Sequence, residues 1–376
     1  MRSSQIACAL AVGVLCFFAE HISSAQVEIS DSASSDSDPM AGFTPEQRRL
    51  ILQQRFNPRR PELPVDPDNW VRDDPSTRDN AQTRQWRTDL KECGPEADHF
   101  RTALLEFEKL APRDKVRGGA EWNALAAQAA QYSRLCLEAI GETSPPREVG
   151  AYLSSVGVLV DTQEAFCGAI ALTDTMILTA RHCFYSIDGD IPNAFHESLR
   201  AGHVQFASLR DSSPLIEVAG IRVSDSPVTG TGRITHLNDY VFLDLRASLP
   251  GFTAIPLSRD FASNAVRRVW LPGPFRFAYA PDASDLAAAA RTSARWSRSG
   301  WCPATISRSG CVQHGCQSVG GFSGSPLLEL QSDGTVSLLG LHRQANDGTG
   351  LCAVSGQRSG NFALAANRIA GIGVTP

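Results

Sequence analysis

The residues best suited to chemistry in this chain are a histidine, an aspartate and a serine that occur in that order. A serine hydroxyl that attacks a carbonyl carbon must lose its proton, which an imidazole accepts while a carboxylate fixes the tautomer of that imidazole. Backbone N–H groups must also face the oxyanion that forms. His182, Asp239 and Ser323 are the candidates for the three side-chain roles.

His182 and Asp239 each border an apolar run. His182 lies in the segment Thr179–Cys183, directly after the apolar residues Met176–Leu178, so a strand end can present it to a cleft. Asp239 directly precedes the run Tyr240–Leu245, where its carboxylate can be buried and held. Taken singly, the histidine would more often be structural and the aspartate a strand cap. Their occurrence in order with the serine favours catalysis.

The segment Gly320–Pro326 is the most specific of the three. Its paired glycines let the backbone turn so that adjacent N–H groups point inward, with Ser323 at the turn. The N–H groups of Gly321 and Ser323 are therefore predicted to form the oxyanion hole. A glycine- and serine-rich loop without chemistry is the alternative for this segment alone, and Ser325 is the alternative nucleophile.

Together these motifs resemble those of the chymotrypsin-like (trypsin-like) serine proteases, over about residues 150–373. Thr179–Cys183 is similar to that family's histidine motif, Asn238–Leu243 to its aspartate motif and Gly321–Pro326 to its nucleophile motif. The resemblance implies two six-stranded β-barrels with the site in the cleft between them. It also implies a serine endopeptidase that acts on protein or peptide substrates without a cofactor or metal. The alternative is a protease-like binding module, although such modules usually show a broken triad.

The positions that would set specificity depart from the animal digestive enzymes. Phe322 stands where those enzymes carry the aspartate that pairs with a newly released N-terminal amine, and Gln317 replaces the pocket carboxylate of a trypsin-like enzyme. Ser318 and His342 instead match the substrate-binding positions of the bacterial glutamyl endopeptidase branch, which predicts glutamate before the cleaved bond. His342 could also be a plain polar strand residue, and its neighbour Arg343 departs from the pattern.

The elements that must position these residues are predicted to be short strands in a closed all-β architecture. The predicted strands are Val156–Val160, Met176–Leu178, Ile216–Val223, Tyr240–Leu245 and Leu327–Leu330, and the turn Gln331–Gly334 brings back Thr335–Leu341 as a hairpin partner.

Four regions are predicted along the chain. Residues 1–25 form an export signal, in which Arg2 precedes the apolar run Ile6–Phe18. Residues 26–76 form a disordered, proline-rich segment, and residues 77–145 a helical pro-region or accessory domain stapled by its two cysteines, Cys93 and Cys136. Residues 146–376 form the protease domain. We expect residues 26–145 to be dispensable for the chemistry.

Charge and composition exclude several classes of protein. The formal net charge is −5, whereas a nucleic-acid partner requires a basic surface. The last lysine is Lys115, so a serine–lysine dyad near Ser323 is impossible. No run after the signal is long and apolar enough to span a membrane, so we expect a mature protein that is secreted, soluble and monomeric.

Eight cysteines remain once the signal is removed, and in an exported chain they predict up to four disulfides. Cys167 is placed to bond Cys183 and to clamp the loop beside His182. Cys311, His314 and Cys316 have the spacing of zinc ligands, but an oxidising compartment favours disulfides over a metal. Three pairings are possible among the last four cysteines, and Cys302–Cys316 with Cys311–Cys352 is the one we predict.

Overall fold

A computed structural model of the chain describes residues 93–372, apart from residues 101, 105, 108, 111–118, 187–190, 224–225, 228–233, 236, 262–264, 308–309 and 346–360. The predicted export signal of residues 1–25 and the predicted proline-rich segment of residues 26–76 lie outside the described residues.

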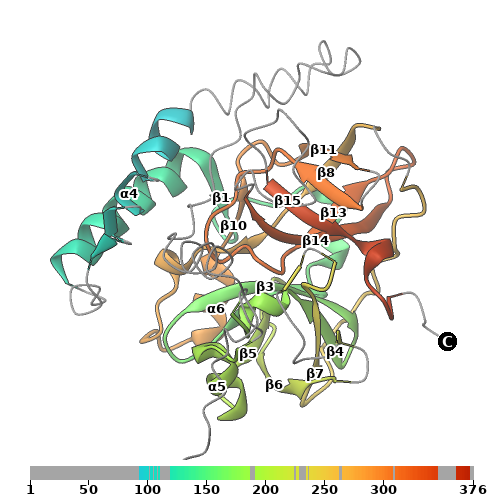
Figure 1. Cartoon of the computed structure of the whole chain (residues 1–376), viewed down its shortest axis with the longest axis horizontal. Helices are drawn as coiled ribbons and strands as arrows, with labels where there is room; N and C mark the ends of the chain where they lie inside the picture. The colour runs from blue at the N-terminus through green and yellow to red at the C-terminus, as the bar shows by residue number, and fades with distance from the viewer. Residues whose placement is uncertain are drawn as a thin grey trace, which may run out of the picture. The chain divides into compact units, whose positions relative to one another are not determined.

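Six antiparallel strands close the N-terminal barrel, in the order β2-β3-β4-β7-β6-β5 (Figure 1). Their bounds are Val156–Val160 for β2, Ala165–Thr173 for β3, Met176–Thr179 for β4, Gln205–Ser208 for β5, Leu215–Ile221 for β6 and Val241–Leu245 for β7. Large side chains such as Leu159, Phe206 and Phe242 are fully buried. All four strands predicted here are present, within two residues of the expected bounds.

A second closed barrel follows, in the order β11-β12-β15-β14-β13-β8. Its strands are β8 Arg267–Trp270, β11 Cys302–Ile306, β12 Cys311–His314, β13 Pro326–Leu330, β14 Val336–Ala345 and β15 Asn361–Ala365. The predicted hairpin is confirmed, because β13 pairs with β14 and the turn between them lies at residues 331–335. The fold is therefore the predicted pair of six-stranded barrels.

A small third sheet, β1-β10-β9, links the N-terminal region to the barrels. β10 (Ala294–Ser297) pairs with β1 (Leu137–Ala139) on one side and with β9 (Gly273–Pro274) on the other. The prediction of helix up to about residue 141 was wrong for β1, because pairing with β10 satisfies its backbone groups as a strand. Local periodicity holds no information about that distant partner.

Helices account for most of the described residues between Cys93 and Cys136, as predicted. Residues 93–100 are helical, and α4 (Ala120–Cys136) follows, drawn in cyan to green in Figure 1. Two short helices, α5 (Ala194–Arg200) and α6 (Leu286–Ser293), lie between strands and were not predicted. No helix among the described residues combines the length and apolar character needed to cross a membrane.

Three predicted disulfides are confirmed. Cys93 is bonded to Cys136, Cys167 to Cys183, and Cys302 to Cys316. Cys311 is also disulfide-bonded, whereas the predicted partner Cys352 lies outside the described residues. With Cys316 and Cys311 both consumed in disulfides, the zinc alternative loses its thiolate ligands.

Candidate active site

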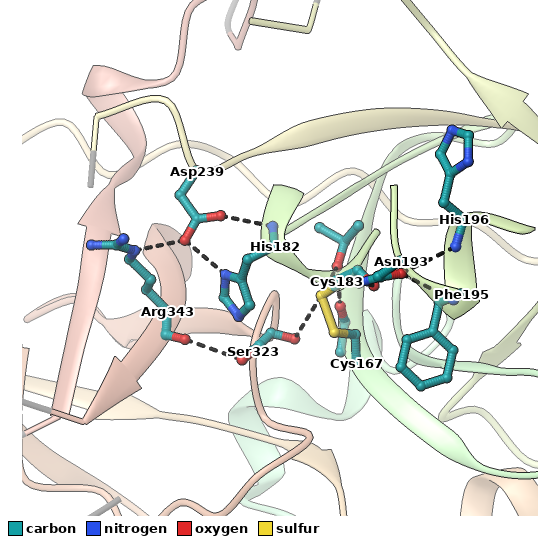
Figure 2. The surroundings of a disulfide bond; sticks show 11 residues. Cys167, His182, Cys183, Asn193, Phe195, His196, Asp239, Ser323 and Arg343 are labelled. Carbon is teal, nitrogen blue, oxygen red and sulfur yellow. Dashed lines mark hydrogen bonds and ion pairs between the residues drawn. A yellow bond between two sulfur atoms is a disulfide. The ribbon is translucent and has the colours of Figure 1, made fainter. Parts of the chain in front are cut away.

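His182 and Asp239 are brought together by the ends of two neighbouring strands of the N-terminal barrel. His182 lies in a short 3-10 turn, Arg181–Cys183, directly after β4, and Asp239 lies two residues before β7, which pairs with β4. The Nδ1 atom of His182 lies 2.8 Å from Oδ2 of Asp239, and the backbone N–H of His182 donates to Oδ1 at 3.0 Å (Figure 2). The carboxylate therefore orients both the ring and the backbone of the histidine.

The carboxylate of Asp239 is charged although it is completely buried. Burial alone would raise its pKa, but attraction and hydrogen bonding to His182, together with the guanidinium of Arg343, hold the pKa of Asp239 well below its usual range. A carboxylate that stays ionised can fix the tautomer of the imidazole and stabilise its protonated form.

Ser323 lies in a tight turn between β12 and β13, and glycines on the turn make this conformation possible. Gly324 has φ +78, and a Cβ atom there would lie 2.1 Å from Oγ1 of Thr179. The loop is held on both sides: the N–H of Gly168 donates to the carbonyl of Ser323 at 2.9 Å, and the N–H of Gly324 donates to the carbonyl of His342 at 2.8 Å. The nucleophile candidate is thus tied to both barrels.

The hydroxyl of Ser323 is half-buried and donates to the backbone carbonyl of Arg343 at 3.1 Å. Figure 2 shows the ring of His182 between the carboxylate of Asp239, to which it is hydrogen-bonded, and Ser323, with the disulfide Cys167–Cys183 close by. The runner-up nucleophile, Ser325, is completely buried, and its hydroxyl lies against the backbone of β3, where a Cβ atom on Gly168 would lie 2.0 Å from its Oγ.

Arg343 supplies a contact that the sequence did not predict. Its Nε donates to Oδ2 of Asp239 at 2.6 Å, so His182 and Arg343 share one carboxylate oxygen. The reason lies in β14: His342 pairs with Ala363 in β15 and Gln344 with Phe362, so Arg343 is the extra residue of a β-bulge. A bulge redirects a side chain out of the regular alternation of the strand. Here it directs the guanidinium to the carboxylate.

The two predicted oxyanion donors border the same turn. Gly321 has φ +113, and a Cβ atom there would lie 2.7 Å from the carbonyl oxygen of Pro274. Within the part of the chain that the structure describes, the N–H groups of Gly321 and Ser323 have no hydrogen-bond acceptor. Unsatisfied backbone donors at such a turn are suited to receive an oxyanion.

The predicted specificity residues are all buried in the C-terminal barrel or next to it. Gln317 and Ser318 are 4% and 5% exposed, and His342 is fully buried. Nδ1 of His342 lies 3.0 Å from Nε2 of His314, which the sequence analysis considered only as a metal ligand. Burial and the neighbouring His342 lower the pKa of His314 well below its usual value, so His314 is neutral.

The described chain has a further hollow, which lies apart from the predicted site residues. A hollow of about 660 Å³ is lined by residues such as Glu142, Ser144 and Arg210, and none of the predicted site residues lines it. The described residues also contain no cluster of His, Cys, Asp and Glu side chains that could hold a metal ion.

Comparison with known proteins agrees with the architecture. Residues 143–271 match the family model described as Trypsin, a stretch that contains His182 and Asp239 but ends before Ser323. No curated protein sequence matches the chain.

Several solved protease structures are similar to parts of the chain. Mouse neuropsin, a serine protease expressed in the limbic system of the brain, is 15% identical, with a TM-score of 0.36 over 57% of this chain and 91% of its own. A Glu endopeptidase in complex with MPD is 12% identical, with a TM-score of 0.38 over 62% and 93%. The Rv3671c protease in its inactive form is 16% identical, with a TM-score of 0.35 over 60% and 94%.

The two closed barrels and the match to the Trypsin model define the class of the protein. The chain has the chymotrypsin-like fold, its residues 143–271 match the Trypsin family model, and it is a serine endopeptidase. Its substrates are therefore proteins or peptides.

Proposed function

We propose that the chain is an exported endopeptidase that cleaves peptide bonds through an acyl-enzyme, with Ser323 as nucleophile, His182 as general base and then general acid, and Asp239 as the orienting carboxylate. The observation that carries the proposal is the buried, ionised Asp239 bonded to both the ring and the backbone of His182. A carboxylate kept charged in this way stabilises the imidazolium that forms when Ser323 gives up its proton.

The proposed mechanism has two half-reactions. Ser323 Oγ attacks the scissile carbonyl while His182 takes its proton, and the N–H groups of Gly321 and Ser323 bind the oxyanion. His182 then gives the proton to the leaving amine, which departs and leaves an ester on Ser323. Water, activated by the same imidazole, hydrolyses the ester and restores the serine.

The nucleophile can be tested directly with an active-site phosphonate, which labels only a serine that is activated by its histidine. We expect the wild-type chain to be labelled at Ser323, and Ser323→Ala to lose the label and several orders of magnitude in turnover. Ser325→Ala is the matched control, because it removes a neighbouring hydroxyl that is completely buried. Loss of labelling in Ser325→Ala but not in Ser323→Ala would overturn the assignment.

Substrate preference is the second part of the proposal: a glutamate side chain before the cleaved bond binds near Ser318 and His342. The support is the imidazole pair, in which His342 lies 3.0 Å from His314. Neutral His314 can donate from its Nε2 to Nδ1 of His342, and the Nε2–H of His342 can then donate to the glutamate carboxylate. A charge can thus be bound without a buried arginine or lysine.

Peptides that differ only in Glu, Gln, Phe or Arg before the scissile bond test this preference. We expect the Glu peptide to have the highest kcat/KM, and His342→Ala to lose that preference by roughly tenfold or more, the usual scale for a charge-assisted hydrogen bond. A preference for Phe or Arg in the wild-type enzyme would end this hypothesis, and so would unchanged selectivity in His342→Ala.

Export is supported by the disulfides, since Cys93–Cys136, Cys167–Cys183 and Cys302–Cys316 form and persist in oxidising compartments. Non-reducing peptide mapping of the secreted protein checks all three pairs. A free thiol at Cys167 or Cys183 in secreted material would contradict this part of the proposal.

A further inference from the structure

The helical N-terminal region shares a hydrophobic core with the C-terminal barrel. We use the term N-terminal unit for the described residues between Cys93 and Ala139, which the disulfide Cys93–Cys136 ties together. Its apolar side chains lie in one buried cluster with side chains of the second barrel and its loops. That cluster includes Phe100, Phe107, Leu125, Ala129, Tyr132 and Leu137 from the unit, and Leu271, Phe275, Cys316, Val319, Phe322 and Leu327 from the barrel.

One member of this cluster belongs to the loop that carries the nucleophile. Phe322 directly precedes Ser323 and is fully buried. A Cβ atom on Gly273 of β9 would lie 2.5 Å from the ring of Phe322, and one on Gly321 would lie 2.7 Å from the carbonyl oxygen of Pro274. The backbone of β9 therefore lies directly against the loop, and β9 is joined through β10 to β1 of the N-terminal unit.

Polar contacts connect the same unit to the segment before the nucleophile. The hydroxyl of Tyr132, on α4, donates to Oε1 of Gln317 at 3.2 Å. The N–H of Gln317 donates to Oγ of Ser297 at 2.5 Å, and Ser297 is the β10 residue that pairs with Leu137 of β1. Tyr132 is fixed in turn by Phe100, whose ring stacks on it with a centroid separation of 5.3 Å.

We propose that the N-terminal unit is a permanent part of the active enzyme, in which it positions the segment from Gln317 to Phe322, and that Tyr132 is the positioning residue for the side chain of Gln317. The inference rests on the proposed function, because this segment matters only if Ser323 is the nucleophile. It replaces the expectation that residues 26–145 are dispensable, as far as residues 93–139 are concerned.

The hydroxyl of Tyr132 fixes the orientation of the side-chain amide of Gln317, because it donates to Oε1. Gln317 is 4% exposed, and among the described residues its Nε2 has no hydrogen-bond partner. Without the hydroxyl nothing in the described chain holds Oε1, so the amide can rotate and exchange its donor and acceptor ends. Since Gln317 stands in the wall of the pocket that the family resemblance predicts, this rotation changes selectivity among substrate side chains.

Tyr132→Phe in the full-length protein tests the positioning role, because it keeps the ring in the cluster and removes only the hydroxyl. Tyr279→Phe is the matched control: Tyr279 is also buried, but its hydroxyl donates to the carbonyl of Asp161, and it packs in a different cluster. The measurements are kcat and KM on the Glu, Gln, Phe and Arg peptides, with the thermal midpoint recorded for both variants.

We expect Tyr132→Phe to change the ratio of kcat/KM between the Glu and Gln peptides by about twofold to tenfold, the scale of one buried hydrogen bond. Tyr279→Phe should leave that ratio unchanged. An unchanged ratio in Tyr132→Phe overturns the positioning role, whatever happens to the thermal midpoint.

The N-terminal sequence of the active enzyme tests the other half of the inference. Protein that is secreted and labelled by the phosphonate should begin before Cys93. A labelled, fully active chain that begins after Ala139 would overturn the inference and leave the proposed function intact. A wild-type chain that takes no label and cleaves no peptide would instead overturn the proposed function.

Discussion

Replacing Arg343 by methionine should change the pH dependence of stability. The Nε of Arg343 donates to Oδ2 of Asp239 at 2.6 Å, the same oxygen that lies 2.8 Å from Nδ1 of His182. At an effective dielectric constant of about 20, two unit charges of opposite sign about 4 Å apart attract by about 4 kcal/mol. The Arg343 side chain is 16% exposed, so solvent screens part of this attraction. About 1.4 to 2.8 kcal/mol remains.

This attraction exists only while the carboxylate is ionised, so Arg343 helps to hold the pKa of Asp239 below its ordinary value. Its contribution to stability is therefore present above the ordinary pKa of about 3.9 and is lost as the pH falls below that value. Arg343→Met should lower the free energy of unfolding by about 1.4 to 2.8 kcal/mol at neutral pH and by progressively less in acid. Arg343→Lys keeps the positive charge and should stay close to the wild type. The assay is urea unfolding of all three proteins from neutral to acid pH.

A difference between Arg343→Met and the wild type that does not shrink in acid would refute the electrostatic reasoning. An equal loss in the lysine and methionine variants would show that the geometry of the bulge matters and the charge does not. Phosphonate labelling of Ser323 in both variants shows whether the active site is still formed.

Three further predictions concern the glycines of two turns, one disulfide and the ionisation of Asp239. Gly324→Ala should abolish peptide cleavage, because its Cβ atom would lie 2.1 Å from Oγ1 of Thr179 and the residue has φ +78. Gly334→Ala is the control: Gly334 has φ +83 but no atom within 4 Å of a Cβ atom, so the substitution should lower the free energy of unfolding in urea by only about 1 kcal/mol. Removing the Cys167–Cys183 bond with alanine at both positions should lower the free energy of unfolding by about 3 kcal/mol, visible as a lower thermal midpoint. Because the pKa of Asp239 is lowered on folding, its ionisation stabilises the fold above its ordinary pKa of about 3.9, and this contribution is lost as the pH falls below that value. Asp239→Asn should therefore differ most from the wild type in unfolding at neutral pH and progressively less in acid.

The features that could be predicted from the sequence are those set by residues close to one another along the chain. β2 and the β13–β14 hairpin could be recognised because their apolar runs and turn residues are local. The pair formed by His182 and Asp239 could be predicted because each residue borders an apolar strand, and those two strands turn out to be neighbours. The disulfide Cys93–Cys136 could be predicted because no other cysteine lies in that region.

The contacts that the sequence did not predict depend on pairing between distant segments. Arg343 reaches Asp239 only because β14 gains one residue relative to β15, and a bulge leaves no mark in hydrophobic periodicity. Tyr132 reads as one more apolar position on a helix, and its partner Gln317 lies 185 residues away. His314 was weighed as a metal ligand from its cysteine neighbours, whereas its actual partner is a histidine on another strand.

Apolar packing holds the nucleophile loop in place, because the residue before Ser323 is a phenylalanine and not an aspartate. An aspartate at this position could pair with a terminal amine, which loses its charge near its ordinary pKa of about 8. Phe322 is held instead by apolar packing against β9 and the shared cluster, and such contacts do not titrate. The packing of this loop therefore does not depend on the charge of a newly created amine. What the loop needs is the packing itself, and the N-terminal unit supplies part of that packing through α4 and the sheet that begins with β1.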